Sequence, residues 1–293
     1  MPYITTSDKV QLYYEETGAG EPIVFVHEFG GDMRSWEPQM RYFSRRYRCI
    51  AFNARGYTPS DVPDDLELYS QRRAALDVVD VLDGLDIPKA HIVGLSMGGF
   101  ATVHVGLIAP ERALSLVVAG AGYGAEKAHE EYFRNVSMEV AAQFEKQGAE
   151  RFSKTYALAA SRIAFQLKDP RGWAEFAQDL SQHSALGAAM TMRGVQARRP
   201  SLYDLEDELK SMTVPTLIVV GDEDDHCLQP GIFMKRVIPA SGLAVLPKAG
   251  HTLNLEDPAL FNQVVADFLA TVAQQRWLPR DPRAQASQIM KTS

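Results

Sequence analysis

Cysteine, excess positive charge and long apolar runs are scarce in this chain, and each shortage excludes a class of protein. Two cysteines in 293 residues exclude a disulfide-dense secreted scaffold. The formal net charge of −7 provides no basic face for nucleic acid phosphates. No apolar run approaches the roughly 20 residues that span a bilayer, and the first residues lack a leader pattern. We therefore expect a cytoplasmic protein with no nucleic acid partner and no membrane partner.

A metal or another cofactor is not expected either. His226 and Cys227 are adjacent, but no second pair of ligands with zinc-type spacing accompanies them. Cys49 lies in an apolar run and is expected to be a small buried side chain. The remaining candidate partner is a small-molecule substrate, and the sequence does not indicate an oligomeric state.

Patterns typical of buried strands and of helices alternate along much of the chain. Strand-like runs occur at 9–16, 22–27, 47–53, 90–94, 114–119, 215–220 and 243–246. Helical patterns occur at 35–46, 69–85 and 258–272. Because continuous apolar runs indicate strands covered on both faces, this alternation predicts an α/β fold. We expect a mostly parallel central sheet of about eight strands with helices on both faces.

The alternation stops between residues 124 and 212, where no convincing strand pattern occurs. Helix-forming residues dominate this stretch, with helical periodicity at 140–149 and 173–180. We therefore expect several inserted helices, here called the helical insertion. The predicted organisation is a core formed by residues 1–123 and 213–275, the helical insertion at 124–212, and a loose tail at 276–293.

The most informative segment is His91–Phe100, an apolar strand that runs through Gly-Leu-Ser-Met-Gly into a helix-compatible run. This context is typical of a nucleophile elbow, in which a serine occupies a tight turn between a strand and a helix. Gly94 and Gly98 fit the turn because a Cβ atom at either position would collide with neighbouring backbone. The elbow would place the Ser96 hydroxyl at a helix N-terminus, which favours developing negative charge.

A histidine and an acid follow later strands in the order that this architecture requires. His251 follows the strand-like run at 243–246, and an acidic cluster at 222–225 follows the run at 215–220. Functional groups in a parallel sheet gather beyond the C-terminal strand ends. His251 is therefore the candidate general base for Ser96.

The acid that would orient His251 is less sharply defined by the sequence. Asp224 stands three residues after the strand-terminal Gly221, a reach that suits a turn toward a histidine. Asp225 is the alternative, and the other carboxylates of the cluster would cap a helix that begins near Pro230 or face solvent. Such a carboxylate would fix the imidazole tautomer and stabilise the imidazolium.

An oxyanion would also need two N–H donors. One should come from Met97, the residue after the nucleophile, and the other from the glycine-rich loop after the strand at 22–27. Phe29 is the expected donor in that loop, because Gly30 and Gly31 let the backbone fold tightly beside it.

Together these motifs resemble those of the α/β-hydrolase family over nearly the whole chain to about residue 272. The similar segments are His27–Gly31 (oxyanion loop), Asn53–Ser60 (the loop with an arginine and glycine), Gly94–Gly98 (elbow) and Gly221–Asp224 (acid turn). The resemblance implies that the helical insertion is a cap that covers the active site. It implies a serine hydrolase with Ser96, Asp224 and His251 as its triad.

Two residues depart from the family pattern. Glu28 replaces a glycine and Asn53 replaces an aspartate. We expect the Glu28 carboxylate either to be held by a cation, with Arg55 and Arg34 as candidates, or to tune His251. Its charge should disfavour a substrate carboxylate near that position.

The expected reaction is cleavage of a small-to-medium carboxylic ester, thioester or lactone through an acyl-enzyme on Ser96. Carbon–carbon bond hydrolysis and perhydrolase or cofactor-free haloperoxidase chemistry are alternatives on the same triad. A non-catalytic small-molecule receptor is the alternative of a different class. Glu28, Tyr123 and Trp173 are the candidate substrate-binding residues, although aromatic residues of the insertion could instead pack its helices together.

Overall fold

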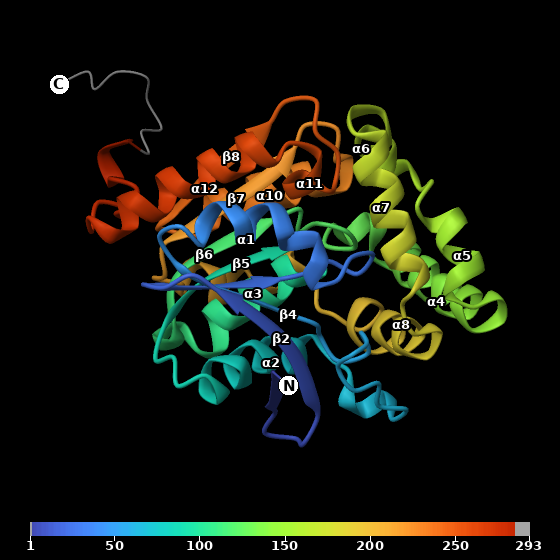
Figure 1. The fold of residues 1–293 in the computed structure, drawn as a ribbon. Coiled ribbons are helices and arrows are strands. Elements are labelled where there is room, and N and C mark those ends of the chain that lie inside the picture. The colour runs from blue at the N-terminus through green and yellow to red at the C-terminus, as the bar shows by residue number, and fades with distance from the viewer. Residues whose placement is uncertain (1, 285–293) are drawn as a thin grey trace.

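A computed structural model of the chain describes residues 2–284, and an eight-stranded sheet forms the centre of the molecule (Figure 1). Its strands are β1 (Tyr3–Thr5), β2 (Gln11–Thr17), β3 (Pro22–Val26), β4 (Arg48–Phe52), β5 (Ala90–Leu95), β6 (Ala113–Ala119), β7 (Thr216–Gly221) and β8 (Ser241–Leu246). The spatial order is β1-β2-β4-β3-β5-β6-β7-β8. Strands from β4 to β8 in this order pair in parallel, whereas β2 is antiparallel to β1 and β4. The predicted α/β architecture is confirmed.

Helices cover both faces of the sheet, which explains why the central strands are continuously apolar. One face packs against α2 (Gln71–Gly84), α3 (Met97–Ile108) and α10 (Asp225–Val237), and the other against α1 (Glu37–Phe43) and α12 (Pro258–Ala273). Along β3, Val24 contributes to the first core, and Ile23 and Phe25 contribute to the second. Side chains of a strand alternate between faces, so a strand covered on both sides is apolar at most of its positions.

Some boundaries differ from those that the sequence pattern predicted. The helix expected at 35–46 is shorter, because a 3-10 turn at Met33–Trp36 precedes α1. The prediction of a helix that begins near Pro230 was wrong. Helix α10 begins at Asp225 and contains Pro230, although proline usually favours the first helical turn.

The helical insertion lies between β6 and β7 in the chain and at one end of the sheet (Figure 1). Its helices are α4 (Glu130–Gln147), α5 (Ala149–Tyr156), α6 (Ala160–Lys168), α7 (Pro170–Ser181), α8 (Ala185–Thr191) and α9 (Glu206–Ser211), with a π-helical turn at Met192–Gln196. Buried aromatic residues of this segment, including Phe144 and Phe176, form one apolar cluster with Phe29 and Met97. The insertion therefore packs directly on the two loops predicted to hold an oxyanion.

The described part of the C-terminal segment packs against the end of the sheet. The Trp277 ring lies edge-on to Phe268, with ring centroids 4.6 Å apart, and its Nε1 donates to the Ala240 carbonyl at 2.9 Å. Of the tail expected at 276–293, residues 285–293 lie outside the described residues. Within residues 2–284, no helix is both long and apolar enough to cross a membrane.

Candidate active site

Ser96 occupies a strained turn between β5 and α3. Its φ is +54°, in the left-handed region that L-residues seldom adopt. A Cβ atom at Gly94 would lie 2.1 Å from the Gly98 carbonyl oxygen, and one at Gly98 would lie 2.0 Å from the Val26 carbonyl oxygen. The two glycines are therefore required by close backbone packing, and the strain is concentrated at the serine itself. Such strain is typical of a functional position.

His251 and Asp224 form a buried hydrogen-bonded pair beyond the ends of β8 and β7. The His251 Nδ1 lies 2.7 Å from Asp224 Oδ2. Burial acts to raise the pKa of Asp224, but the charge and hydrogen bond of His251 outweigh it and hold that pKa below its usual range. Asp225 instead begins α10. The geometry thus joins Asp224, rather than Asp225, to the imidazole.

Ser96 and His251 line the same cavity, which has a volume of about 60 Å³. Because Nδ1 of His251 faces Asp224, Nε2 is the ring nitrogen available to the serine. Within residues 2–284, no hydrogen bond joins the Ser96 hydroxyl to His251. Contacts of this kind are often longer before substrate binds and shorten in the substrate complex.

The His27–Gly31 loop, predicted to hold an oxyanion, is fixed by backbone and ring contacts that leave one N–H free. His27 Nε2 accepts from the Ala54 N–H at 3.0 Å, so its Nδ1 is the donor to the Glu28 carbonyl at 2.7 Å. The Tyr57 hydroxyl donates to the Phe29 carbonyl at 2.9 Å. In the described part of the chain, the Phe29 N–H has no hydrogen-bond acceptor. Met97 is the first residue of α3, so its N–H has no acceptor within the helix.

Glu28 is neutralised by a residue that the sequence did not reveal as its partner. The Arg162 guanidinium, from α6 of the insertion, holds both carboxylate oxygens of Glu28, with Nη1 2.9 Å from Oε1. Both side chains are buried, with 1% and 2% of Glu28 and Arg162 exposed. Arg162 Nη1 also donates to Thr252 Oγ1 at 2.6 Å. The Arg162 guanidinium therefore connects Glu28, which precedes Phe29, with Thr252, which follows His251.

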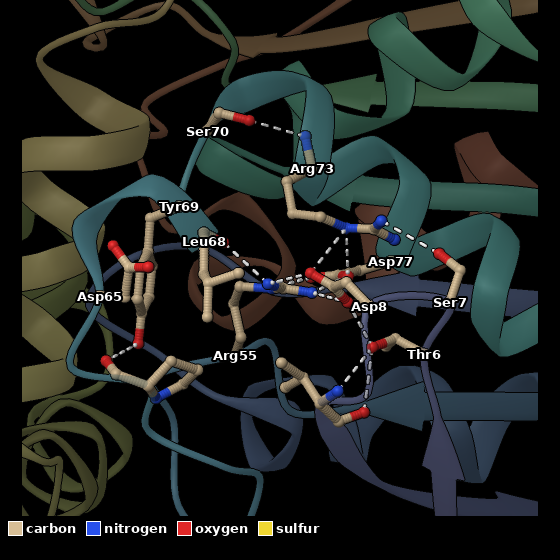
Figure 2. Close-up of polar contacts among 12 residues, drawn as sticks. Thr6, Ser7, Asp8, Arg55, Asp65, Leu68, Tyr69, Ser70, Arg73 and Asp77 are labelled. Carbon is tan, nitrogen blue, oxygen red and sulfur yellow. Dashed lines mark hydrogen bonds and ion pairs between the residues drawn. The ribbon is translucent and has the colours of Figure 1, made fainter.

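The expectation that Arg55 or Arg34 holds Glu28 was wrong, because both arginines have other carboxylate partners. Arg55 pairs with Asp77 at 2.7 Å and with Asp8 at 2.8 Å, as Figure 2 shows. Arg34 pairs with Asp32 at 2.6 Å and with a carboxylate of α7. These two residues lie near Glu28 in the sequence, whereas the true partner is 134 residues away.

The second departure from the family pattern has a local explanation. Asn53 Oδ1 accepts from the Met33 N–H at 2.9 Å, and Asn53 Nδ2 donates to the Thr58 carbonyl at 2.8 Å. A carboxylate could accept the first bond but could not donate the second. The amide therefore satisfies both neighbouring backbone groups.

The two aromatic candidates for substrate contact lie in different places. The Tyr123 ring borders the cavity with its centroid 4.9 Å from that of His251. Trp173 lines a separate surface groove with Glu150, and its Nε1 donates to the Ala157 carbonyl at 2.8 Å. The structure therefore brings Tyr123, but not Trp173, to the cavity that holds Ser96.

Glu256 supports the loop that carries His251. Its carboxylate accepts the Gly250 N–H at 2.7 Å and the Thr252 N–H at 2.8 Å, so it grips the residues on both sides of the histidine. Burial raises the pKa of Glu256, and these two backbone bonds oppose that rise. In the sequence, Glu256 is indistinguishable from an ordinary acidic residue at a helix start.

Comparison with known proteins identifies the family to which this fold belongs. A family model described as the alpha/beta hydrolase fold matches residues 21–258. The chain belongs to the α/β-hydrolase family. Its relatives are enzymes. The chain is 30% identical to 3-oxoadipate enol-lactonase 1 of Acinetobacter baylyi over 252 residues, which cover 85% of this chain and 89% of the relative. The resemblance identified from the sequence is thus confirmed.

Solved structures of other α/β-hydrolases superpose over most of the chain. A thermophilic esterase from Thermogutta terrifontis has a TM-score of 0.82 at 25% identity and covers 92% of this chain and 98% of its own. The enol-lactonase from Burkholderia xenovorans has a TM-score of 0.80 at 22% identity, with 92% of this chain and 100% of its own covered. The latter similarity concerns the fold alone.

Proposed function

We propose that this α/β-hydrolase cleaves a small-to-medium carboxylic ester, thioester or lactone through an acyl-enzyme on Ser96. The observation that carries the proposal is that the strained Ser96 and the Asp224-bound His251 line one cavity. A serine hydroxyl is a weak nucleophile unless a base accepts its proton, and an oriented imidazole is such a base. No metal is needed in this scheme.

The reaction would proceed in two halves. Ser96 Oγ attacks the carbonyl carbon while His251 Nε2 takes its proton, and the N–H groups of Phe29 and Met97 stabilise the oxyanion. Collapse of this intermediate breaks the bond to the leaving group, to which His251 returns the proton. Water then attacks the acyl carbonyl carbon while His251 takes its proton. The bond from the acyl group to Ser96 Oγ breaks, the acid leaves, and His251 returns the proton to Ser96 Oγ. Asp224 keeps the imidazole in the required tautomer throughout.

The helical insertion acts as the cap in this proposal. Tyr156, Ser161, Arg162, Met192 and Gln196 from the insertion all border the cavity that contains Ser96. The small cavity volume, about 60 Å³, favours a substrate of modest size. The relative named as an enol-lactonase and the structural neighbour named as an esterase support lactones and esters as the first compounds to test.

A fluorophosphonate probe and a substrate panel test this proposal. The probe should attach to Ser96, as peptide mass spectrometry would show. Steady turnover should be measured with p-nitrophenyl esters of increasing acyl length and with simple lactones. Attachment at another residue, or a single burst of p-nitrophenol without further turnover, would contradict the proposal and favour a receptor.

The Glu256→Gln variant should lower kcat by about 10- to 100-fold because the loop of His251 loses one of its two carboxylate contacts. The KM for the same ester should change little, since Glu256 does not border the cavity. The matched control is Glu223→Gln, which removes an exposed carboxylate paired with Lys248 on the neighbouring loop. Equal kcat values for the two variants would show that Glu256 does not position His251.

A further inference from the structure

Arg199 brings a positive charge to the active-site cavity, in a chain whose formal net charge is −7. Its Nη2 donates to the Tyr123 carbonyl and its Nη1 to the Gln196 side-chain oxygen. Its Nε is buried and has no hydrogen-bond partner. A guanidinium offers five N–H donors, so these contacts hold the group in place and leave donors unused.

Two aromatic rings contact this guanidinium. The Arg199 Cζ lies 3.7 Å from the ring centroid of Phe100 and 4.8 Å from that of Phe133. Burial lowers the pKa of Arg199 to about 9, so the side chain remains charged at neutral pH. These ring contacts help to hold the charge in place but supply no counterion.

The other charged side chains that line the cavity have partners of opposite charge or hydrogen-bonded partners. Within residues 2–284, the Arg199 guanidinium has no carboxylate partner. Glu28 is held by Arg162, and Asp224 is bonded to His251. No carboxylate of the described residues lies within 4 Å of the Arg199 guanidinium. Arg199 is half-buried, with its Nε fully removed from solvent. Arginines removed from water normally have carboxylate partners, because an unpaired charge is destabilising there. A cavity that keeps such a charge and also contains Ser96 is arranged for an anionic ligand.

We propose that Arg199 binds a carboxylate group of the substrate, so that the enzyme acts on a carboxylate-bearing ester or lactone. This inference rests on the proposed function and specifies its substrate class. A carboxylate fits because its two oxygens match the planar fork of a guanidinium. This inference reverses the expectation that the Glu28 charge would disfavour a substrate carboxylate, because Arg162 already compensates that charge.

Matched ester pairs test the inference through kcat/KM ratios. The first pair is p-nitrophenyl hemisuccinate and p-nitrophenyl butyrate, which differ by a carboxylate on the acyl side. The second is 4-carboxyphenyl acetate and phenyl acetate, which differ on the leaving-group side. The wild-type enzyme should prefer the anionic member of at least one pair, and Arg199→Gln should reduce that preference by about 10- to 100-fold.

Two further variants separate recognition from folding. Arg199→Lys should recover part of the preference, because it restores the charge without the fork. Arg198→Gln, which removes an exposed arginine paired with Glu67, should leave the preference unchanged. Parallel losses for both members of each pair in Arg199→Gln, or a wild-type enzyme that prefers both neutral esters, would overturn the inference.

Binding without turnover distinguishes this inference from the proposed chemistry. Calorimetry with succinate and glutarate on Ser96→Ala should detect a complex that weakens at least about 10-fold when Arg199→Gln is added. Such binding in a protein that hydrolyses no ester would sustain the carboxylate site and refute the proposed reaction. Equal binding by the single and double variants would refute the carboxylate site, even if neutral esters are hydrolysed.

Discussion

Replacement of Ser96 with alanine is expected to lower kcat for a turned-over ester by at least ~10³-fold. The variant keeps the N–H groups of Phe29 and Met97 and the bulk of the cavity, so KM should change far less than kcat. The residual rate would come from the oxyanion contacts and from substrate positioning alone. Steady-state kinetics on the best ester of the panel provide the measurement.

The control for Ser96→Ala is a serine replacement away from the proposed active site. Ser211→Ala removes an exposed hydroxyl at the end of α9, far along the chain from the elbow, and should retain full activity. Ser96→Ala should melt no lower than the wild type, because a left-handed turn tolerates alanine no worse than serine at this position. A Ser96→Ala enzyme that keeps a tenth of the wild-type kcat would eliminate the acyl-enzyme mechanism.

The Glu28→Gln variant should have the largest effect on stability, a loss of about 3–5 kcal/mol in the free energy of unfolding. Glutamine is nearly isosteric with glutamate, but it leaves the buried Arg162 guanidinium without a counterion. Removal of one partner of a buried pair is more damaging than replacement of both, because the remaining charge stays desolvated. Urea denaturation monitored by tryptophan fluorescence gives the free energy of unfolding by linear extrapolation to zero urea.

A double-mutant cycle isolates the interaction from the separate effects. Arg162→Met should also be destabilising, whereas Glu28→Gln combined with Arg162→Met should lose clearly less stability than the two single losses together. Glu37→Gln, which breaks the exposed pair with Arg41, is the control and should change stability by less than about 0.5 kcal/mol. Additive losses in the cycle would mean that Glu28 and Arg162 do not stabilise each other.

The parts of the site that the sequence predicted depend on short-range patterns. Ser96 and its flanking glycines lie within five residues of one another, and their packing follows from a turn too tight for a Cβ atom. His251 and Asp224 follow strands, and parallel strands present their C-terminal ends at one edge of a sheet. The alternation of apolar runs and helices was sufficient to predict that sheet.

The residues that the sequence did not predict act over long range. Arg162 and Arg199 belong to a helical segment in which arginines are common and mostly exposed. Their spacing in the sequence does not indicate which of these arginines face the cavity. Glu256 was equally hidden, because a carboxylate at a helix start is ordinary whether it faces solvent or grips backbone N–H groups. The identity of a buried charge partner depends on tertiary packing, which a local pattern does not contain.

The bridge from Arg162 to Glu28 and Thr252 limits how freely this enzyme can exchange parts with its relatives. A chimera with a foreign segment in place of residues 124–212 would lose Arg162, so the buried Glu28 carboxylate would have no counterion even if every backbone junction were matched. Transplantation should succeed only when position 28 is changed to glycine in the same step. Modularity in this scaffold is therefore conditional, because the two halves have an electrostatic dependence on each other that no boundary between domains reveals.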